Sequence, residues 1–316
     1  MAAEPEPPSP PAVCHPRLLL LAGPTAVGKS AIALLLAEKL GGEIVSVDSM
    51  QVCRGLDIGT AKASRGDRAR VPHHLIDVVE VTEPFDAAQF VRLASRAVAD
   101  IQSRGRLPIL CGGTGLYFKA FLEGLGQAPP ADTALRAVLQ ATPLPELLRE
   151  LAERDPATYE RIDRQNPRRV IRALEVIRLT GKPFSAQRAD WHHASRITHH
   201  AAHSLGFARS AADLRQRIET RVDAMFRQGW VAETEQLLRR GLAQNKTAMQ
   251  ALGYRQIIEH LRGERSLPET IELVKARTRQ FAKRQMTWFR RQLQLTWINL
   301  EPHSSAETVA ESIASL

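Results

Sequence analysis

The chain has 316 residues, of which 44% are hydrophobic and 24% are charged, and its formal net charge is +9. This length allows about two domains with a sizeable core, and the basic balance favours a polyanionic partner, with nucleic acid as the first candidate. The cysteines include no Cys-x-x-Cys pair, which excludes a disulfide scaffold or zinc finger and fits a reducing cytoplasm. No apolar stretch is long enough to span a membrane.

The N-terminal segment contains the strongest single motif. Residues 1–16 are rich in proline and glutamate, which excludes a secretory signal and predicts a disordered tail. The apolar run 18–22 then predicts a strand, and residues 23–30 read GPTAVGKS. This is the phosphate-binding pattern Gly-x-x-x-x-Gly-Lys-Ser/Thr between a strand and a helix, predicted over 30–40. We call residues 23–30 the phosphate loop. Lys29 offers a charge to terminal phosphates, and the Ser30 hydroxyl can bind Mg²⁺.

Further strand–helix units follow the phosphate loop. The pattern predicts strands over 44–47, 75–79 and 107–111, and a helix from the cap residue Asp86 to Ser103. Alternating strands and helices predict a parallel sheet covered on both faces, with ligands at the carboxyl ends of its strands. The phosphate loop, Asp48 and Thr114 are therefore expected to meet at that edge.

The character of the chain changes near Gly126. The segment QAPPAD (127–132) is a linker, and the pattern from there to about Trp191 is helical without a clear strand. We therefore predict an all-helical insertion over 126–196 in an α/β phosphate-loop core formed by 17–125 and 197–316. In the second core segment, a returning strand over 199–207 precedes helices at about 210–227, 230–240, 250–262 and 268–292, then a strand at 296–300.

Positive charge gathers in three places. From Leu273 to Leu300 there is no Asp or Glu, and Lys275, Arg279 and Lys283 lie at four-residue spacing on one face of the predicted helix. Phe281, Trp288 and Phe289 lie at other positions and are predicted to anchor that helix. The second cluster is Arg164, Arg168, Arg169 and Arg172, and the third is Arg215, Arg217 and Arg221. Each can be a solvated helix face, but together with the phosphate loop they favour a large anionic substrate.

Asp48 and Thr114 are the candidates for chemistry. Asp48 ends a buried strand near the phosphate loop, where a carboxylate can hold Mg²⁺ or take a proton from an acceptor, or can simply cap a turn. Thr114 lies in a glycine-rich turn and can hydrogen-bond a phosphate or a leaving oxygen. Nucleotide kinases commonly place a metal-binding acid after a second apolar strand. Here 107–111 leads into GGTG without one, which argues mildly against phosphoryl transfer.

Together these segments resemble the tRNA dimethylallyltransferases, also called tRNA isopentenyltransferases, of bacterial type. The matching blocks run in family order over nearly the whole chain after the tail: GPTAVGKS (23–30), the segment 46–62 with SVDSMQV and DIGTAK, PHHLID (72–77), GGTGLY (112–117), RRVIRALEV (168–176), RIETRV (217–222), ALGYRQ (251–256) and TRQFAKRQMTWFR (278–290). Eight ordered blocks are far more specific than the phosphate loop alone. One departure is Cys53, where members often have Tyr.

The resemblance implies a reaction and its partners. The family transfers a dimethylallyl group from dimethylallyl diphosphate to N6 of the adenosine at position 37 of tRNA, just 3′ of the anticodon, and releases diphosphate. The implied partners are the prenyl diphosphate, the anticodon stem-loop of tRNA and Mg²⁺, with a monomeric cytoplasmic enzyme as the expected form. The target base is extruded into a channel, as base-modifying enzymes require.

The resemblance also assigns roles to residues. Asp48 matches the group that accepts a proton from the adenosine amine or orients it, and Thr114 a contact to the leaving oxygen. The diphosphate-binding residues are Gly23, Thr25, Ala26, Val27, Gly28, Lys29, Ser30 and Arg221, with Ser30 as the metal ligand. The tRNA-binding residues are Asp48, Ser49, Met50, Gln51, Arg136, Arg168, Arg169, Val170, Ile171, Arg172, Gln250, Ala251, Leu252, Gly253, Tyr254 and Arg255.

Three alternatives remain open from the sequence. An adenylate isopentenyltransferase would use free AMP or ATP and has less need of Arg168, Arg169 and the basic C-terminal helix. A phosphate-loop kinase would bind ATP tightly with Mg²⁺ and phosphorylate a small acceptor. A non-catalytic RNA-binding NTPase would leave its RNA unchanged.

Overall fold

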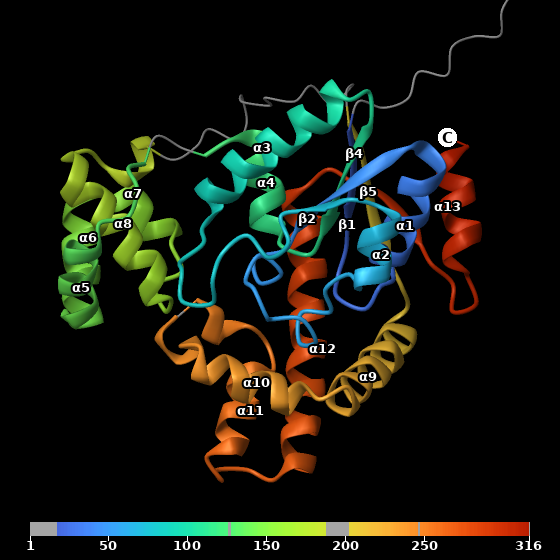
Figure 1. Cartoon of the computed structure of the whole chain (residues 1–316). Helices are drawn as coiled ribbons and strands as arrows, with labels where there is room; N and C mark the ends of the chain where they lie inside the picture. Colours follow the sequence, from blue (N-terminus) through green and yellow to red (C-terminus); the bar gives the residue numbers. More distant parts are fainter. Residues whose placement is uncertain (1–17, 126–127, 188–201, 246, 316) are drawn as a thin grey trace, which may run out of the picture. The chain divides into compact units, whose positions relative to one another are not determined.

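The computed structural model describes residues 18–125, 128–187, 202–245 and 247–315 (Figure 1). The predicted N-terminal tail lies outside these residues. The described chain divides into a core unit, which includes 18–118 and 202–315, and an insertion unit that begins at Lys119. This division falls inside a helix, whereas the change in composition suggested a boundary near Gly126.

The core unit is built on a six-stranded parallel sheet, as the alternating pattern predicted. The strand order is β3-β2-β4-β1-β5-β6, and every pairing is parallel. The strands are β1 (Leu18–Ala22), β2 (Gly42–Val47), β3 (His73–His74), β4 (Leu107–Gly112), β5 (Ala202–Ala208) and β6 (Thr296–Asn299). All residues of β1, β2 and β4 are buried, as expected for central strands covered on both faces.

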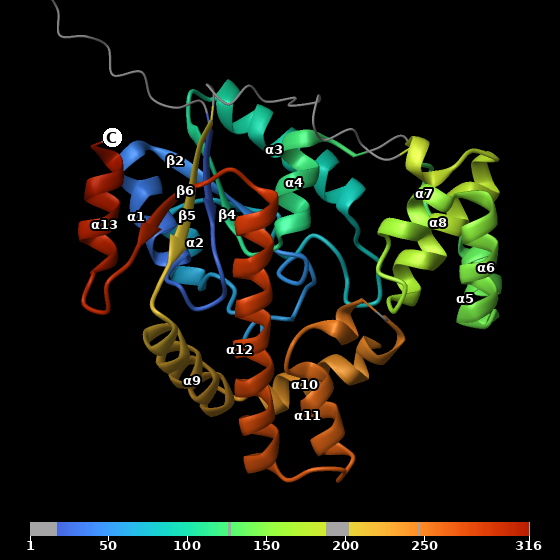
Figure 2. The ribbon, with the colours of Figure 1, turned by 180° about the vertical axis from the view of Figure 1, so that it is seen from behind.

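Helices cover the sheet and extend beyond its carboxyl edge. One face packs against α1 (Lys29–Leu40) and α13 (Ala306–Ala314), whose apolar side chains share a buried cluster with Leu19, Leu21 and Ile109. On α3 (Ala87–Ser103), the Asp86 side chain accepts from the Gln89 N–H in a capping box. The other core helices are α2 (Arg65–Arg70), α9 (Ala211–Arg227), α10 (Trp230–Arg239), α11 (Tyr254–Leu261) and α12 (Leu267–Gln292). Figures 1 and 2 show α9, α10 and α11 grouped where β5 leads out of the sheet.

The predicted strand over 75–79 is wrong. The strand in this region is β3, at His73–His74, and it pairs with Ile44 and Val45 of β2. Leu75 (φ 62°) and Asp77 (φ 57°) adopt left-handed backbone conformations, so the extended chain cannot continue through them. Val79 retains one isolated bridge to Cys53. Apolar content alone predicted this strand, and it carries no information about these two turns.

The insertion unit is helical in its described residues, as predicted. It contains α5 (Thr133–Ala141), α6 (Leu144–Arg154), α7 (Pro156–Arg161) and α8 (Pro167–Thr180), followed by a 3₁₀ turn at Phe184–Gln187. Helix α4 (Gly115–Glu123) leads into it from the core. Leu139, Leu147, Leu151 and Leu174 form its buried cluster with neighbouring α8 side chains. The unit therefore has an apolar core of its own.

Glu175 is the buried charge at the centre of the insertion. Its carboxylate accepts from the Asp132 N–H (3.0 Å), Arg136 Nη2 (2.6 Å) and Arg172 Nη1 (2.8 Å). Burial by itself would raise the pKa of Glu175, but the hydrogen bonds from Arg172 and Arg136 outweigh burial and hold the pKa below its usual value. The ionised carboxylate thus joins the start of α5 to α8.

We expect Glu175→Gln to destabilise the insertion by about 2 kcal/mol, because the amide leaves two arginines without a counter-charge. Hydrogen exchange of α8 backbone amides would measure the loss, with exposed Glu153→Gln as the control. The pKa of Glu175 is lowered in the folded protein. Its contribution to stability is therefore fully present above the ordinary carboxyl pKa, and it is lost as the pH falls through the pKa of the folded state. Equal exchange in the variant and the wild type would contradict this role.

Candidate active site

The site is positioned by the aligned carboxyl ends of three neighbouring strands. Gly112 of β4 pairs with Ala22 of β1 on one side and with Val47 of β2 on the other. The phosphate loop follows Ala22, Asp48 follows Val47, and Thr114 lies two residues beyond Gly112. The predicted convergence of these three elements is therefore confirmed by the register of the sheet.

The phosphate loop is held in a conformation that requires left-handed residues. Ala26 has φ 64°, and Gly28, which precedes α1, has φ 108°. Gly28 adopts this angle without the steric cost that a Cβ would add. The loop thus ends at a helix N-terminus, where free N–H groups and the helix dipole favour an anion.

Two arginines fix the phosphate loop by its carbonyl oxygens. Arg209 Nε donates to the Val27 carbonyl (2.8 Å), and Arg217 Nε donates to the Ala26 carbonyl (3.0 Å). Arg209 also pairs with Asp213 (2.7 Å). No role was predicted for Arg209 from the sequence. The sequence feature that could have indicated a role is the position of Arg209 directly after β5, at the same edge of the sheet as the phosphate loop.

Gln285 on α12 joins the phosphate loop to the turn that carries Thr114. Its Oε1 accepts from the Thr25 N–H (2.8 Å), and its Nε2 donates to the Gly113 carbonyl (2.9 Å). A Cβ at Gly113 would lie 2.4 Å from Gln285 Nε2, so a side chain there would displace the Gln285 amide from this position. Gln285 belongs to the block TRQFAKRQMTWFR, but its two hydrogen bonds depend on tertiary packing and could not be foreseen.

Lys29, Arg221 and Asp48 form a charged group beside the phosphate loop. Burial lowers the pKa of Lys29, and the nearby Arg221 lowers it further while Asp48 acts in the opposite direction. Burial likewise lowers the pKa of Arg221, against the attraction of Asp48. No ion pair joins either cation to a carboxylate within the described ranges. Two half-buried cations without a paired carboxylate leave an excess of positive charge for an anionic ligand.

Asp48 has one carboxylate oxygen in use within its own turn. Oδ1 accepts from the N–H groups of Met50 (2.8 Å) and Gln51 (3.2 Å). No hydrogen bond within the described part of the chain engages Oδ2. The interpretation of Asp48 as a turn residue is therefore correct for one oxygen, and the other oxygen is available to a ligand.

Thr114 is linked directly to the Asp48 segment. Its N–H donates to the Val47 carbonyl (3.1 Å), and its Oγ1 accepts from the Ser49 N–H (3.1 Å). Since Oγ1 acts as an acceptor in that bond, its own proton can be donated to a ligand oxygen. Thr114 is thus held beside Asp48 with a hydroxyl donor to spare.

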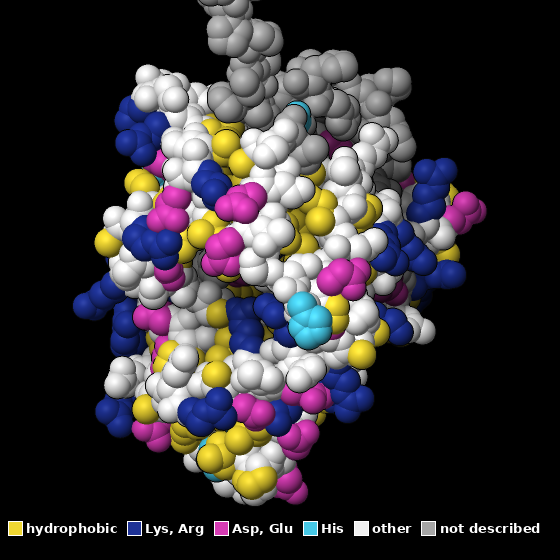
Figure 3. Space-filling model, turned by 90° about the vertical axis from the view of Figure 1, so that its right-hand side faces the viewer, with side chains coloured by type: hydrophobic (Ala, Val, Ile, Leu, Met, Phe, Trp, Pro, Cys, Tyr) yellow, Lys and Arg dark blue, Asp and Glu magenta, His cyan; other side chains and the backbone are white. Residues whose placement is uncertain are grey.

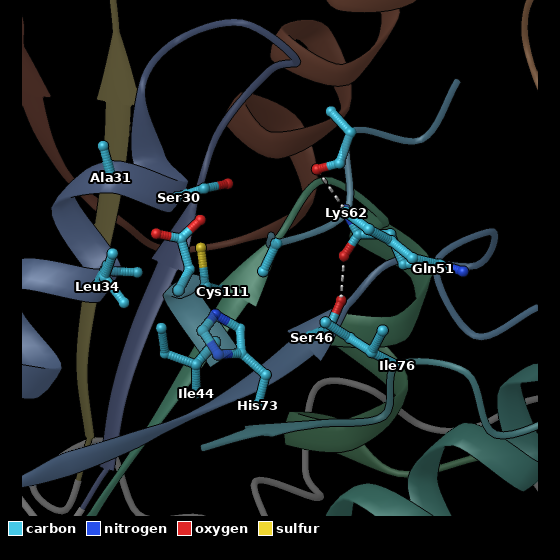
Figure 4. Close-up of a pocket in the computed structure, with 14 residues that line it drawn as sticks. Ser30, Ala31, Leu34, Ile44, Ser46, Gln51, Lys62, His73, Ile76 and Cys111 are labelled. Carbon is cyan, nitrogen blue, oxygen red and sulfur yellow. Dashed lines mark hydrogen bonds between the residues drawn. The ribbon is translucent and has the colours of Figure 1, made fainter. Parts of the chain in front are cut away.

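A cavity of about 270 Å³ opens beside Ser30, between α1 and the segment that follows β2 (Figure 4). Ala31, Leu34, Ile44 and Ile76 are among its apolar lining residues. Its polar lining consists of Ser30, Ser46, Gln51, Lys62, Asp67 and His73, with Cys111 at the sheet. Burial raises the pKa of the Cys111 thiol to about 11, so the thiol is neutral and adds to the apolar character of the wall.

The predicted tRNA-binding segment 250–255 is only partly exposed. Ala251 and Tyr254 are buried, whereas Arg255 is exposed and pairs with Glu259 (3.1 Å). The predicted helix over 250–262 begins at Tyr254, since Gly253 (φ 95°) separates it from a 3₁₀ turn at Ala248–Gln250. RNA contacts of Ala251 and Tyr254 would have to use backbone groups, because their side chains lie inside.

The predicted tRNA-binding residues of α8 fall into two groups. Arg168 and Arg169 are exposed on its first turn. The side chains of Val170 and Ile171 belong to the buried cluster of the insertion, and Arg172, like Arg136 of α5, is paired with Glu175. Of these four arginines, Arg168 and Arg169 are the more exposed, which makes them the better candidates for direct phosphate contacts.

The basic face expected on α12 is largely neutralised. Lys275 pairs with Asp223 (2.8 Å) and Glu272, and Arg279 pairs with Glu219 (2.8 Å). The face in Figure 3 likewise shows Lys and Arg interspersed with Asp and Glu. Phe289 is buried and anchors α12 as predicted, but the anchoring prediction is wrong for Phe281, which is exposed. Local spacing did not reveal the acidic partners on α9.

Metal binding at this site would depend on the ligand. The described residues contain no group of three or more His, Cys, Asp or Glu side chains placed to hold a metal ion. Ser30, the predicted metal ligand, is exposed on the first turn of α1. Mg²⁺ is commonly held by one or two protein groups together with substrate phosphates and water, and Ser30 fits that arrangement.

Comparisons with known proteins agree with one another. A family model described as IPP transferase matches residues 51–292. The tRNA dimethylallyltransferase of Geobacter metallireducens is 48% identical over 287 residues, which cover 89% of this chain and 92% of the relative. The tRNA dimethylallyltransferase 1 of Trichlorobacter lovleyi is 46% identical over 295 residues, covering 92% and 96%.

The solved structures that resemble this chain include tRNA-modifying transferases of the same kind. The tRNA isopentenylpyrophosphate transferase of Bacillus halodurans is 37% identical, with a TM-score of 0.69 and 94% of each chain covered. A eukaryotic dimethylallyltransferase acting on tRNA is 27% identical, with a TM-score of 0.79 over 94% of this chain and 77% of that one.

We expect Gln285→Ala to weaken the binding of inorganic diphosphate about tenfold and to lower the free energy of unfolding by about 1–3 kcal/mol. The reason is that the Thr25 N–H and the Gly113 carbonyl lose their buried partner. Calorimetric titration and urea unfolding would measure both changes, with Gln280→Ala, on an exposed position of the same helix, as the control. Unchanged diphosphate affinity in a folded Gln285→Ala protein would show that this bridge does not shape the loop.

Proposed function

Since the chain belongs to the IPP transferase family, we propose that it transfers a dimethylallyl group from dimethylallyl diphosphate to N6 of the adenosine at position 37 of tRNA, releasing diphosphate. One observation carries this proposal above the others. The phosphate loop, the Asp48 carboxylate and the Thr114 hydroxyl meet at the carboxyl ends of three adjacent strands. This transfer requires a binding site for the diphosphate leaving group, a proton acceptor for the amine and a hydrogen-bond donor to the leaving oxygen.

The donor half of the site is suited to a diphosphate. The N–H groups at the start of α1 and the cations Lys29 and Arg221 bind its oxygens and stabilise the negative charge that grows as the allylic C–O bond breaks. The Thr114 hydroxyl donates to the oxygen that leaves. Mg²⁺ at Ser30 would add positive charge to the diphosphate when bound.

The acceptor half centres on Asp48. The N6 amine attacks the allylic carbon, the C–O bond to diphosphate breaks, and the amine proton passes to the carboxylate. Oδ1 is held by two backbone N–H groups, which fixes the orientation of Oδ2 toward a ligand. A base inside a folded anticodon loop cannot reach this carboxylate, so the adenosine is extruded from the stack.

The cavity beside Ser30 is suited to the small apolar chain of the proposed donor, dimethylallyl diphosphate. Its apolar wall of alanine, leucine and isoleucine side chains lies next to the residue proposed to hold the metal and diphosphate. A five-carbon chain buried there is removed from water together with the reacting carbon. Hydrolysis of the carbocation-like intermediate is thereby disfavoured.

Arg168 and Arg169 are proposed to bind the anticodon stem through its phosphates, where shape and charge are sufficient for recognition. Within the described ranges, no helix combines the length and apolar character needed to cross a bilayer. The monomeric state and the cytoplasmic location stay predictions.

The direct test is mass spectrometry of adenosine recovered from unmodified tRNA after incubation with dimethylallyl diphosphate and the protein. The proposal expects a nucleoside carrying one added dimethylallyl group at N6. Parallel reactions with AMP, and with ATP and labelled phosphate, identify the alternatives. Prenylation of AMP alone would favour an adenylate isopentenyltransferase, phosphate transfer a kinase, and unchanged RNA a binding protein.

We expect Asp48→Asn to lower turnover by about 10²–10⁴-fold, because the amide cannot accept the N6 proton. Affinity for tRNA, measured by filter binding, should change little, since the amide oxygen can still accept from Met50 and Gln51. Asp100→Asn, on an exposed position of α3, serves as the control. Wild-type turnover in Asp48→Asn would remove Asp48 from the role of base.

The Arg168→Ala/Arg169→Ala double variant should weaken tRNA binding and reduce the slope of log K against log salt by about 1–2. Arg154→Ala/Arg178→Ala is the matched control, because both arginines are paired with Glu150. Salt titration of tRNA affinity checks the prediction. An equal slope in the wild type and the Arg168/Arg169 variant would exclude these two side chains as phosphate contacts.

A further inference from the structure

Glu233 on α10 receives hydrogen bonds from two segments that are distant in sequence. Its Oε2 accepts from the N–H groups of Asp57 (3.2 Å) and Ile58 (2.7 Å). Its Oε1 accepts from the Gly59 N–H (3.3 Å) and from the Tyr254 hydroxyl (2.7 Å). One carboxylate thus binds three consecutive backbone amides of the DIGTAK segment and the first residue of α11.

Trp230, one turn before Glu233, fixes the same two segments by packing. Its indole lies against Gly59 and Gly253, where added Cβ atoms would come within 2.3 Å and 2.0 Å of the ring. It also contacts the Tyr254 ring edge to face, with the centroids 5.6 Å apart. Both Trp230 and Tyr254 are fully buried. The two glycines therefore allow α10 to approach both segments closely enough for Glu233 to reach them.

A chain of hydrogen bonds continues from this contact to Asp48. Gln51 Nε2 donates to the carbonyls of Thr60 (3.0 Å) and Ala61 (3.4 Å), directly after the amides that Glu233 holds. Gln51 Oε1 accepts from Ser46 Oγ (2.8 Å), as Figure 4 shows, and the Gln51 N–H donates to Asp48 Oδ1. A displacement of residues 57–61 would therefore also move Gln51 and the turn that holds Asp48.

We propose that Glu233 is a positioning residue, which ties the Asp48–Ala61 segment to the segment 250–255 and so aligns the acceptor half of the active site. The inference rests on the proposed function for the identity of the acceptor, an adenosine in RNA. Glu233 takes no part in the chemistry itself, because its carboxylate is occupied by four protein donors. It acts through Gln51 and through the backbone of residues 250–255.

The diphosphate-binding part of the donor half is supported independently of Glu233, whereas Gln51 and Ala61 also line the cavity proposed for the five-carbon chain. Gln285, Arg209 and Arg217 hold the phosphate loop from α12, from the end of β5 and from α9. Loss of Glu233 should therefore disturb the acceptor substrate and spare the binding of the diphosphate group of the donor. A residue that only stabilised the fold would affect both substrates alike.

The experiment compares Glu233→Ala and Glu233→Gln with Glu235→Gln, a control on an exposed position of the same helix. Steady-state kinetics would be measured with unmodified tRNA and dimethylallyl diphosphate varied in turn. We expect Glu233→Ala to lower kcat/KM for tRNA about tenfold or more, while the Kd for inorganic diphosphate, measured by calorimetric titration, stays within about twofold. The kcat/KM of Glu233→Gln for tRNA should lie between those of the wild type and Glu233→Ala, because the amide oxygen can still accept hydrogen bonds from some of the N–H groups of residues 57–59.

A second measurement does not depend on catalysis. Hydrogen exchange at the amides of Asp57, Ile58 and Gly59 should become about tenfold faster in Glu233→Ala than in the wild type, whereas amides at the start of α1 should be unaffected. If the wild type modifies no tRNA, the proposed function fails, and exchange still tests the tie itself.

Two results would overturn the inference. The first is a folded Glu233→Ala protein whose kcat/KM for tRNA and whose exchange at 57–59 both equal those of the wild type. The second is an equal fold loss in kcat/KM for tRNA and in affinity for inorganic diphosphate, which would mean that Glu233 supports the whole site rather than its acceptor half.

Discussion

The alignment of β1, β4 and β2 is the constraint on which the active site depends. Because Gly112 pairs with both Ala22 and Val47, the three strands end in one row. A shift of one residue in the β2–β4 pairing would separate Thr114 from the Asp48 segment, which are joined by two hydrogen bonds of 3.1 Å, and a shift in the β1–β4 pairing would move the phosphate loop relative to Thr114. Parallel pairing of buried strands keeps this register, since every side chain on each face would otherwise lose its packing.

Charge is distributed around this edge in a consistent way. Most arginines of the described chain are paired with carboxylates or hold carbonyl oxygens, as Arg172, Arg279 and Arg209 do. Lys29 and Arg221 form no ion pair with a carboxylate among the described residues, although Lys29 Nζ donates to the Pro24 carbonyl (3.1 Å), and burial lowers the pKa of both cations. An anionic ligand between them would relieve their mutual repulsion, so affinity for a diphosphate arises where the protein leaves its own charges unbalanced.

The sequence alone was sufficient to predict those features of the fold and the site that depend on local sequence pattern. It predicted the parallel core, the helical insertion and the meeting of the phosphate loop with Asp48 and Thr114, because apolar runs and strand ends determine these features. It did not predict Gln285, Arg209 or Glu233, each of which has at least one hydrogen-bond partner more than a hundred residues away in the sequence. It also misplaced β3, where left-handed turns at Leu75 and Asp77 end the extended chain. Contacts fixed by tertiary packing leave no periodic signal in the sequence.

The most direct test of this account is a crystal structure with a non-reactive thio-diphosphate analogue of the donor and an anticodon stem-loop RNA. We expect the diphosphate to lie against the phosphate loop, Lys29 and Arg221, and N6 of an extruded adenosine to lie within hydrogen-bonding distance of Asp48 Oδ2. An adenosine bound away from Asp48 and Thr114, with the diphosphate in the phosphate loop, would contradict the central claim that these three elements form one reaction centre.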